Sequence, residues 1–289
     1  MSYVIYTDSS ANLTNEIIEQ YGIKVIPLVF LSGGKEYLGF DKDNPVDLLP
    51  FYKMLRKKEL ITTSCVNDND FVNAFGQDIK EGKDIIYLSI SSNLSATYSN
   101  ALKAVSLLKN GYPQRKIIAV DSLGASMGQG LMAMYAAKMQ KEGKTIDETA
   151  DWLENNKLKL CHYFTVDNLF YLFRGGRVKA TSYLLANIIN IKPIMHADDN
   201  GKLVAIGKVV GRNKSISVLA QKTIENIVNP NEQIICIAHG DCIDDAMSLR
   251  DKILSQIQVK DCIINYLDPV IGAHSGPDTL AVFFLGTKR

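Results

Sequence analysis

The chain has 289 residues, enough for one large domain or two ordinary ones, each with a substantial core. Hydrophobic residues make up 46% of it and charged residues 22%, which is typical of a soluble globular protein. The chain has 32 Lys and Arg and 31 Asp and Glu, so its net charge is only +1. This overall composition excludes the strongly positive electrostatic field with which proteins bind DNA or RNA.

The first elements are a strand and a helix. Residues 2–8 form an apolar run that predicts a strand. Residues 12–22 predict a helix, with Asn12 or Thr14 near its N-terminal cap and Gly22 closing it. The chain therefore starts with the order expected of an α/β protein.

A second strand and a second helix follow. The apolar run at 23–33 predicts one strand, which leads into a hairpin-like segment at 33–43. Residues 44–60 have the pattern of an amphipathic helix that starts near Pro45, and Pro50 is expected to interrupt it. These elements extend the alternation of strands and helices.

The remaining segments divide the chain into two parts. Up to residue 143, apolar strands separated by helices predict a parallel sheet covered on both faces, with strands at 84–89 and 116–122 and helices at 95–111 and 126–143. Later segments mix strand pairs with helices, including a hairpin at 191–211 turned at 199–201. We therefore predict an α/β fold of two domains: an N-terminal parallel-sheet α/β domain over 1–158 and a C-terminal α+β domain with a mixed sheet over 159–289.

The sequence also predicts where the protein resides. Its N-terminal residues enter a strand without a basic segment or a cleavage site, and no apolar run approaches the ~20 residues of a membrane span. The five cysteines are odd in number and scattered, mostly inside apolar segments, as in proteins whose thiols stay reduced. We expect a soluble, cytoplasmic protein.

Neither a nucleotide site nor a metal site is predicted. The glycines of "GASMGQG" (124–130) have the wrong spacing for a dinucleotide fingerprint, and their small size favours close helix–sheet packing instead. No Walker lysine loop is present, so the chain is not expected to bind ATP by itself. Cys236, His239 and Cys242 recur at intervals of three, but no second ligand pair follows at a workable distance, which favours a buried strand with a polar loop over a metal site.

Three polar segments together favour a site for a small anion. A run of hydroxyl and amide side chains follows the strand at 84–89, arginines flank the glycines of "FRGGRV" (173–178), and His274 and Ser275 are expected in a Gly/Pro-rich turn. Hydroxyls and helix N-termini donate hydrogen bonds, and the guanidinium of an arginine can donate two parallel hydrogen bonds to a carboxylate. Simpler interpretations remain open: Ser92 or Ser95 can cap the following helix, and the arginines can lie on a solvated loop.

Eight motifs in order resemble the DegV family of fatty-acid-binding proteins, which includes the FakB subunit of bacterial fatty acid kinase. The resemblance covers essentially the whole chain and rests on "TDSSANLT" (7–14), "TTSCVN" (62–67), "SSNLSATY" (91–98), "DSLGASMGQG" (121–130), "FRGGRV" (173–178), "IKPIM" (191–195), "IAHGD" (237–241) and "IGAHSGPDTLAV" (271–282). Each motif alone is weak, but eight in the same order identify the family.

The resemblance implies a ligand and a set of residues that bind it. It implies one long-chain fatty acid of the C16–C18 type, held with its carboxylate between the domains and its tail buried. By motif, Thr63 and Ser95 meet the carboxylate, and Arg177 and His274 complete the polar network. Neighbours expected from the same motifs are Ser64, Ser92 and Asn93. No cofactor or metal is implied.

The resemblance also implies a partner. A separate ATP-binding kinase subunit would phosphorylate the bound carboxylate, giving an acyl-phosphate for phospholipid synthesis, and the present chain would present the substrate without being a catalyst itself. Arg212 is the residue through which docking to that subunit is expected. Two alternatives remain open: a stand-alone hydrolase or transferase that uses Ser95 and His274, and a lipid-sensing regulator without a kinase partner.

The chain departs from the family pattern at several positions. Val66 replaces the proline of the T-S-x-P motif, Ala96 replaces a glycine and would be strained if that position required a positive φ, and Asp278 replaces a glycine and adds a negative charge near the site. Val210 stands where the family often has an arginine. The accepted chain length is expected to depend on the packing of segments such as 182–195.

Overall fold

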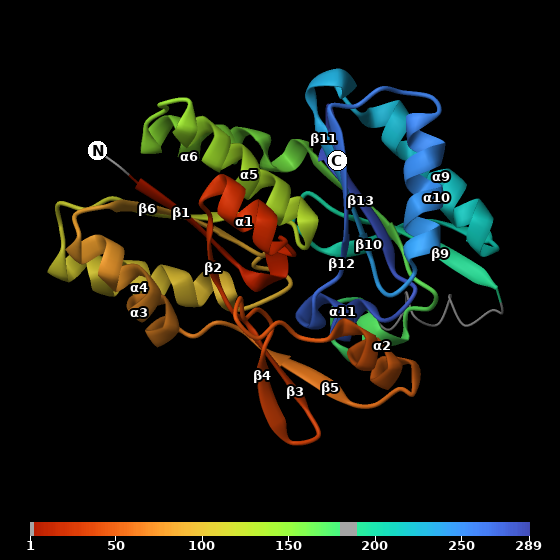
Figure 1. The fold of residues 1–289 in the computed structure, drawn as a ribbon, viewed down its shortest axis with the longest axis horizontal. Helices are drawn as coiled ribbons and strands as arrows, with labels where there is room; N and C mark the ends of the chain where they lie inside the picture. The colour runs from red at the N-terminus through yellow and green to blue at the C-terminus, as the bar shows by residue number, and fades with distance from the viewer. Residues whose placement is uncertain (1–2, 180–189) are drawn as a thin grey trace.

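The computed structural model describes residues 3–179 and 190–289, and the strands of these ranges form three sheets (Figure 1). One sheet is parallel and lies in the N-terminal half, and a mixed sheet lies in the C-terminal half, so the predicted α/β fold class is confirmed. Most of the segment 182–195, expected to affect ligand length, lies outside the described residues. Within those two ranges, no helix is long and apolar enough to cross a membrane.

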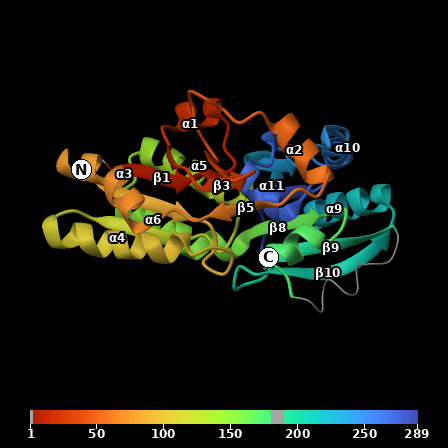
Figure 2. The ribbon, with the colours of Figure 1, turned by 90° about the horizontal axis from the view of Figure 1, so that it is seen from below.

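The parallel sheet has the strand order β2-β1-β6-β7, and each strand pairs in parallel with its neighbour. Its strands are β1 (Tyr3–Asp8), β2 (Lys24–Ile26), β6 (Asp84–Ser89) and β7 (Ile117–Asp121). Helices cover both faces (Figures 1 and 2), with α3 (Asp68–Lys80) and α4 (Thr97–Gly111) on one and α1 (Asn15–Tyr21), α5 (Met127–Lys141) and α6 (Ile146–Asn156) on the other. Because both faces are covered, β6 is buried at every position.

The ends of α1 follow the sequence signals. The Thr14 hydroxyl accepts a hydrogen bond from the Ile17 amide, which makes Thr14 the cap rather than Asn12. Gly22 ends the helix with φ of +70°, a conformation that glycine adopts without strain. The prediction of this helix is confirmed.

The prediction of a single strand over 23–33 is wrong. The chain leaves the parallel sheet at Ile26, and after Pro27 and Leu28 it enters a separate antiparallel sheet of order β4-β3-β5. Its strands are β3 (Val29–Ser32), β4 (Lys35–Leu38) and β5 (Ile61–Ser64). Pro27 has no amide hydrogen for a sheet ladder, which explains a break at this point. The hairpin between β3 and β4 is confirmed.

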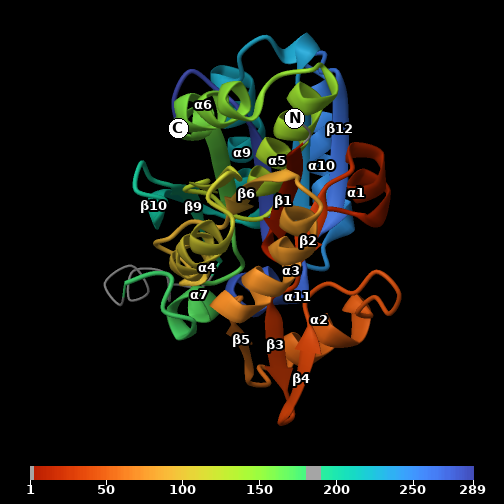
Figure 3. The same cartoon turned by 90° about the vertical axis from the view of Figure 1, so that its left-hand side faces the viewer.

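The helix expected near Pro45 begins later. Helix α2 spans Leu48–Arg56, and the Asp47 carboxylate caps it by accepting a hydrogen bond from the Leu49 amide at 3.1 Å. Pro50 lies in the first turn, where a missing amide hydrogen removes no helical hydrogen bond, so the expected interruption does not occur. Figure 3 shows α2 beside the small sheet, which projects from the rest of the molecule.

The mixed sheet has the strand order β10-β9-β8-β13-β11-β12, and only β11 and β12 pair in parallel. Its strands are β8 (Leu160–Thr165), β9 (Ile191–Ala197), β10 (Leu203–Val210), β11 (Ile234–His239), β12 (Asp261–Tyr266) and β13 (Leu280–Leu285). Helices α9 (Arg212–Asn226) and α10 (Ile243–Leu254) cover its outer face (Figure 1). The first of these strands begins at Leu160, next to the predicted boundary at 158/159, although the division into two domains stays a prediction.

Helix α5 lies between the parallel and mixed sheets and packs against strands of both (Figure 1). Its small residues allow this close approach. A Cβ on Gly130 would fall 2.5 Å from the carbonyl oxygen of Ala11, and one on Gly128 would fall 2.3 Å from the His162 Nε2. The interpretation of 124–130 as a packing segment is therefore confirmed.

The side chain of Arg289 fixes the loop before α5. Its guanidinium donates to the carbonyl oxygens of Leu123 at 2.7 Å, Lys157 at 2.8 Å and Asp198 at 2.9 Å. One side chain thus joins the loop after β7, the short helical turn before β8 and the β9–β10 turn.

Candidate functional site

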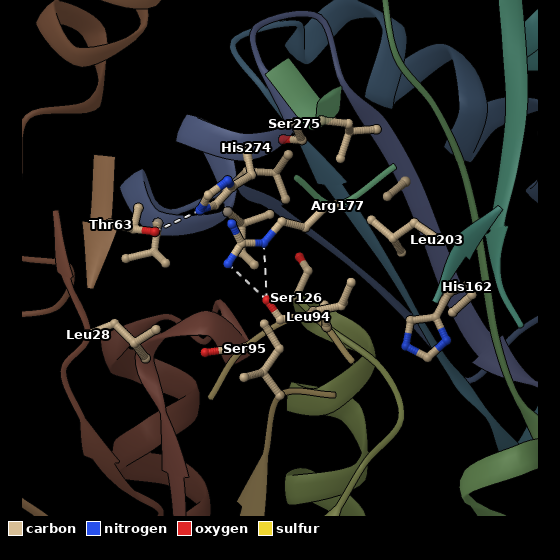
Figure 4. Close-up of a pocket in the computed structure, with 18 of the residues that line it drawn as sticks. Leu28, Thr63, Leu94, Ser95, Ser126, His162, Arg177, Leu203, His274 and Ser275 are labelled. Atoms are coloured by element: carbon tan, nitrogen blue, oxygen red, sulfur yellow. Dashed lines mark hydrogen bonds between the residues drawn. The ribbon is translucent and has the colours of Figure 1, made fainter. Parts of the chain in front are cut away.

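A cavity of about 350 Å³ lies where the small sheet, the N-terminal end of α5 and the mixed sheet meet (Figure 4). Most of its wall is apolar and includes Leu28, Phe164, Leu203, Val270 and Phe283. Polar side chains gather at one end. A largely apolar cavity with a few converging polar groups is the usual form of a site for a small organic ligand.

Thr63 and His274 form the centre of the polar end. Thr63 lies on β5, where it pairs with Phe30, and its Oγ1 is 2.7 Å from the His274 Nε2. His274 lies in α11 (Pro269–Ser275), whose start is capped by the Asp268 carboxylate. The prediction that His274 lies in a Gly/Pro-rich turn is therefore wrong. Proline suits the first position of a helix, and the turn comes only at Gly276.

The His274 ring is uncharged at neutral pH. Burial, together with the charges of Arg177 and Arg174, lowers its pKa from 6.5 to about 3. Its Nδ1 is buried and has no hydrogen-bond partner among the described residues. A neutral imidazole beside a hydroxyl can take part in hydrogen bonding without adding a second positive charge to the cavity.

The depressed pKa of His274 predicts how stability depends on pH. Between about pH 3 and 6.5 the unfolded chain binds a proton at this ring that the folded chain does not, so stability falls as the pH drops below about 6.5. We expect His274→Gln to reduce the loss of unfolding free energy between pH 7 and 5 by about 1–2 kcal/mol. Urea denaturation of the wild type and of His274→Gln at pH 7 and pH 5 measures this loss of unfolding free energy. Equal losses in the two proteins would contradict the prediction.

Arg177 brings a positive charge to the cavity. It follows α7 (Phe170–Arg174) and two glycines, and its Nε and Nη2 donate to the Leu94 carbonyl oxygen at 3.1 and 2.9 Å (Figure 4). Nη1 donates to the carbonyl oxygen of Gly175. Burial lowers the pKa of Arg177, and within the described ranges no carboxylate forms an ion pair with it or lines the cavity. A partly buried cation held only by carbonyl groups is suited to binding an anion.

The two glycines before Arg177 have different roles. Gly176 has φ of +75°, which favours glycine for backbone reasons. Gly175 has an ordinary helical φ of −76°, but a Cβ there would fall 2.2 Å from the His274 Nδ1. Gly175 therefore provides the space that the imidazole occupies.

Ser64 and Ser95 also line the cavity. The Ser95 hydroxyl lies 2.8 Å from the Thr97 hydroxyl and accepts from the Thr97 amide at 3.2 Å. The N-cap of α4 is Ala96, so the simpler interpretation of Ser92 or Ser95 as the cap is wrong. Ala96 has φ of −72° and is not strained. The structure thus brings five predicted residues to one cavity: Thr63, Ser64, Ser95, Arg177 and His274.

Ser92 and Asn93 do not line the cavity. The Ser92 amide donates to the Asp121 carboxylate, and the Asn93 side chain donates to the Asn200 carbonyl oxygen at 2.8 Å. Ser91 adds a hydrogen bond to the Gly201 carbonyl oxygen at 2.9 Å. The side chains of Ser91 and Asn93 hold the β9–β10 turn against the loop after β6.

The alternative of a hydrolase lacks its central contact. Among the described residues, Ser95 Oγ has Thr97 as its hydrogen-bond partner, whereas His274 pairs with Thr63. A serine nucleophile requires a base within hydrogen-bond reach. The geometry favours binding over nucleophilic catalysis by Ser95.

The departures from the family pattern are accommodated locally. Val66 is 1% exposed and belongs to the apolar core. Asp278 has φ of +61°, the conformation that favours glycine, and its carboxylate accepts from the Arg56 guanidinium at 2.7 and 3.0 Å. Arg212, the expected docking residue, pairs with Asp245 at 2.8 Å, and its docking role stays a prediction.

No group of metal ligands occurs in the part of the chain that the structure describes. His239 accepts from the Cys242 amide at 3.2 Å, and its ring lies 4.1 Å from that of Tyr266. Burial lowers the pKa of His239 to about 4 and raises that of the Cys236 thiol. These residues belong to a packed strand and its loop.

Two polar residues of the wall were missed by the sequence analysis. Ser126 and His162 both line the cavity, and both are nearly fully buried, with exposed fractions of 3% and 5%. Ser126 stands in the "DSLGASMGQG" motif, but nothing in its residue type distinguishes it from a helix cap. His162 lies on a buried strand, where its sequence context predicts packing alone.

Comparisons with known proteins agree on one family. The model of a family described as "Uncharacterised protein, DegV family" matches residues 2–287. A DegV domain-containing protein of Clostridium perfringens is 44% identical over 99% of this chain and 98% of its own length. The solved structure of a Thermotoga maritima protein described as revealing a fatty acid binding function is 29% identical, with a TM-score of 0.84 and 99% coverage of both chains. A fatty acid binding DegV family protein of Streptococcus agalactiae is 25% identical, with a TM-score of 0.85 and 100% coverage of both chains.

Proposed function

The chain belongs to the DegV family, and from this premise we propose that it binds one long-chain fatty acid of about 16–18 carbons. The carboxylate lies among Thr63, Ser95, Arg177 and His274, and the hydrocarbon tail occupies the apolar part of the cavity. The protein is a lipid-binding protein and not a catalyst by itself.

The observation that carries this proposal is the environment of Arg177. Its charge faces a cavity whose described wall contains no Asp or Glu, and carbonyl oxygens alone accept its hydrogen bonds. An incoming carboxylate would supply the missing countercharge, and the hydroxyls of Thr63 and Ser95 would donate to it. The two solved relatives named above are described as binding fatty acids.

Burial of the tail provides most of the affinity. Each buried methylene contributes about 0.8 kcal/mol, so about 14 of them contribute on the order of 10 kcal/mol before the cost of ordering the chain. The polar end then needs only to offset the desolvation of the carboxylate. A glycine-rich phosphate loop would serve no purpose in such a site.

Native mass spectrometry of the purified protein, followed by denaturing extraction and lipid analysis, tests the proposal. We expect one fatty acid per chain, and we expect it to be lost from the Thr63→Ala, Ser95→Ala double variant because two donors to the carboxylate disappear. Thr62→Ala is the matched control, since Thr62 is an exposed neighbour on the same strand and does not line the cavity. A protein that stays empty when offered fatty acids would refute the proposal.

We also propose that the bound acid is presented to a separate ATP-dependent kinase subunit for acyl-phosphate formation. This fits the absence of any nucleotide-binding motif from the sequence. With a fatty acid kinase subunit, ATP and hydroxylamine, we expect a fatty hydroxamate to form only when this protein is loaded. Lipid binding without hydroxamate would favour the alternative of a lipid-sensing regulator.

A further inference from the structure

Two acidic residues from separate motifs meet at one arginine outside the cavity. Arg56 is the last residue of α2, and its guanidinium donates to the Asp278 carboxylate at 2.7 and 3.0 Å. It also donates to the Asp241 carboxylate at 3.2 Å and to the Asp241 carbonyl oxygen at 3.1 Å. Asp241 ends the motif "IAHGD", and Asp278 stands in "IGAHSGPDTLAV". Neither aspartate lines the cavity, so the proposed site gives them no role.

Both aspartates have a backbone conformation that favours glycine. Asp241 has φ of +59° and Asp278 has φ of +61°. Their loops are joined, because the Gly240 amide donates to the Thr279 carbonyl oxygen at 2.8 Å and the Asp278 amide donates to the Gly240 carbonyl oxygen at 2.6 Å. Strained positions persist where the surrounding structure fixes them, and they are typical of functional regions. Here the two loops bring both carboxylates to the same guanidinium.

The ion pair of Arg56 with Asp278 joins the two segments that carry Thr63 and His274. Asp278 follows His274 by four residues, and the Thr279 hydroxyl fixes this turn by donating to two carbonyl oxygens between them, both at 2.9 Å. Arg56 precedes Thr63 by seven residues, at the start of the connection from α2 to β5. The contact of Thr63 with His274 at 2.7 Å joins the same two segments inside the cavity (Figure 4).

Helices α2 and α11 also pack directly against each other. A Cβ on Gly272 in α11 would fall 2.8 Å from the Tyr52 hydroxyl oxygen and 3.0 Å from the Phe51 ring. The Tyr52 hydroxyl donates to the Leu267 carbonyl oxygen at 3.0 Å. This packing fixes the middle of α2, whereas Arg56 fixes its C-terminal end, from which the chain continues to β5.

We propose that Arg56 is a positioning residue for the carboxylate site: its ion pairs with Asp241 and Asp278 hold β5 against α11, so that Thr63 and His274 meet the same ligand carboxylate. This inference rests on the proposed fatty acid function and adds to that site a residue outside the cavity wall. The alternative is a purely electrostatic role, in which Arg56 only neutralises two carboxylates that would repel the ligand. The two roles predict different effects for the loss of Asp278.

Partial exposure to water limits the size of the effect. The side chains of Arg56, Asp241 and Asp278 are 40%, 24% and 34% exposed. Ion pairs in contact with water are weak and are screened by salt. We therefore expect the loss of these pairs to weaken the binding of octadecanoic acid about three- to tenfold.

Displacement of a fluorescent fatty acid by octadecanoic acid, from the wild type, Arg56→Met and Asp278→Gly, tests the proposal. Both variants should bind the acid about three- to tenfold less tightly, and the double variant should lose no more than Arg56→Met alone, because the two residues act through one contact. Affinity for octadecanol, which has no carboxylate, should stay unchanged. Lys53→Met is the control, since Lys53 is exposed on the same helix and does not line the cavity.

The stability of Asp278→Gly separates positioning from a general loosening of the fold. Because glycine suits this backbone conformation, the variant should unfold at about the same urea concentration as the wild type while binding the acid less tightly. If Arg56→Met does not fold, Asp278→Gly alone decides the proposal.

Three results would overturn the inference and leave the proposed function intact. They are weaker binding in Arg56→Met with unchanged or tighter binding in Asp278→Gly, equal losses for the acid and the alcohol, and no loss in either variant. The first of them would assign Arg56 the purely electrostatic role. Failure of the wild type to bind octadecanoic acid would refute the proposed function itself.

Discussion

Replacing Arg177 with methionine is expected to weaken the binding of octadecanoic acid about 10- to 100-fold. A hydrogen bond to a charged group contributes about 1.5–3 kcal/mol, and removal of the guanidinium leaves the carboxylate without a countercharge in an apolar cavity. Octadecanol has the same tail without the charge, so its affinity should change little. Displacement titrations with both ligands measure the two effects.

The pair of ligands separates a role in binding from a role in structure. Arg177 also donates to the Leu94 carbonyl oxygen, so a collapsed loop would weaken both ligands equally. That outcome would contradict the predicted carboxylate contact. Arg174→Met is the matched control, because the Arg174 guanidinium lies 5.2 Å from the ring centres of Phe170 and Tyr171 and outside the cavity wall.

Gly175→Ala is expected to abolish most fatty acid binding although it adds a single methyl group. The new Cβ would lie 2.2 Å from the His274 Nδ1, so the imidazole must move and its contact with Thr63 at 2.7 Å is lost. The backbone at Gly175 accepts alanine without strain, so the effect comes from the displaced ring. We expect at least about a tenfold loss of affinity for octadecanoic acid, measured by the same displacement assay.

Gly76→Ala is the control for this substitution. Gly76 lies within α3 and a Cβ there would meet no atom within 4 Å, so alanine should stabilise the helix slightly and leave binding unchanged. A Gly175→Ala protein that binds the acid normally would show that the position of His274 is unimportant. The chemical shift of the His274 ring reports its displacement independently.

The sequence predicts the fold class well because strands and helices of this chain follow strong local signals. Pro27 shows where such reasoning stops. The apolar pattern continues on both sides of it, and only the pairing partners, which lie far away in the sequence, assign Lys24–Ile26 and Val29–Ser32 to different sheets. Pro50 shows that a proline's effect depends on the turn in which it lies, and a one-residue shift in a helix start changes that turn.

The candidate site was predicted in part. Thr63, Ser95, Arg177 and His274 come from four separate segments, and the motif order rather than any local pattern indicated that they meet. Ser92 and Asn93 share the residue types of the site, but the Ser92 amide donates to the Asp121 carboxylate, and the Asn93 side chain donates to a turn about a hundred residues later. His162 was missed because its environment is created by Gly124 and Gly128, and a sequence does not reveal which side chain fills the space beside a glycine.

The position of β13 determines when the cavity can exist during synthesis. This strand comes last among the described strands, yet it lies in the middle of the mixed sheet, between β8 and β11. Its residues Ala281 and Phe283 form part of the cavity wall. While the ribosome is still translating residues 280–285, the two halves of that sheet have no strand to join them. If the proposed function holds, a nascent chain lacks this part of the cavity wall, and we expect lipid loading to follow the completion of β13.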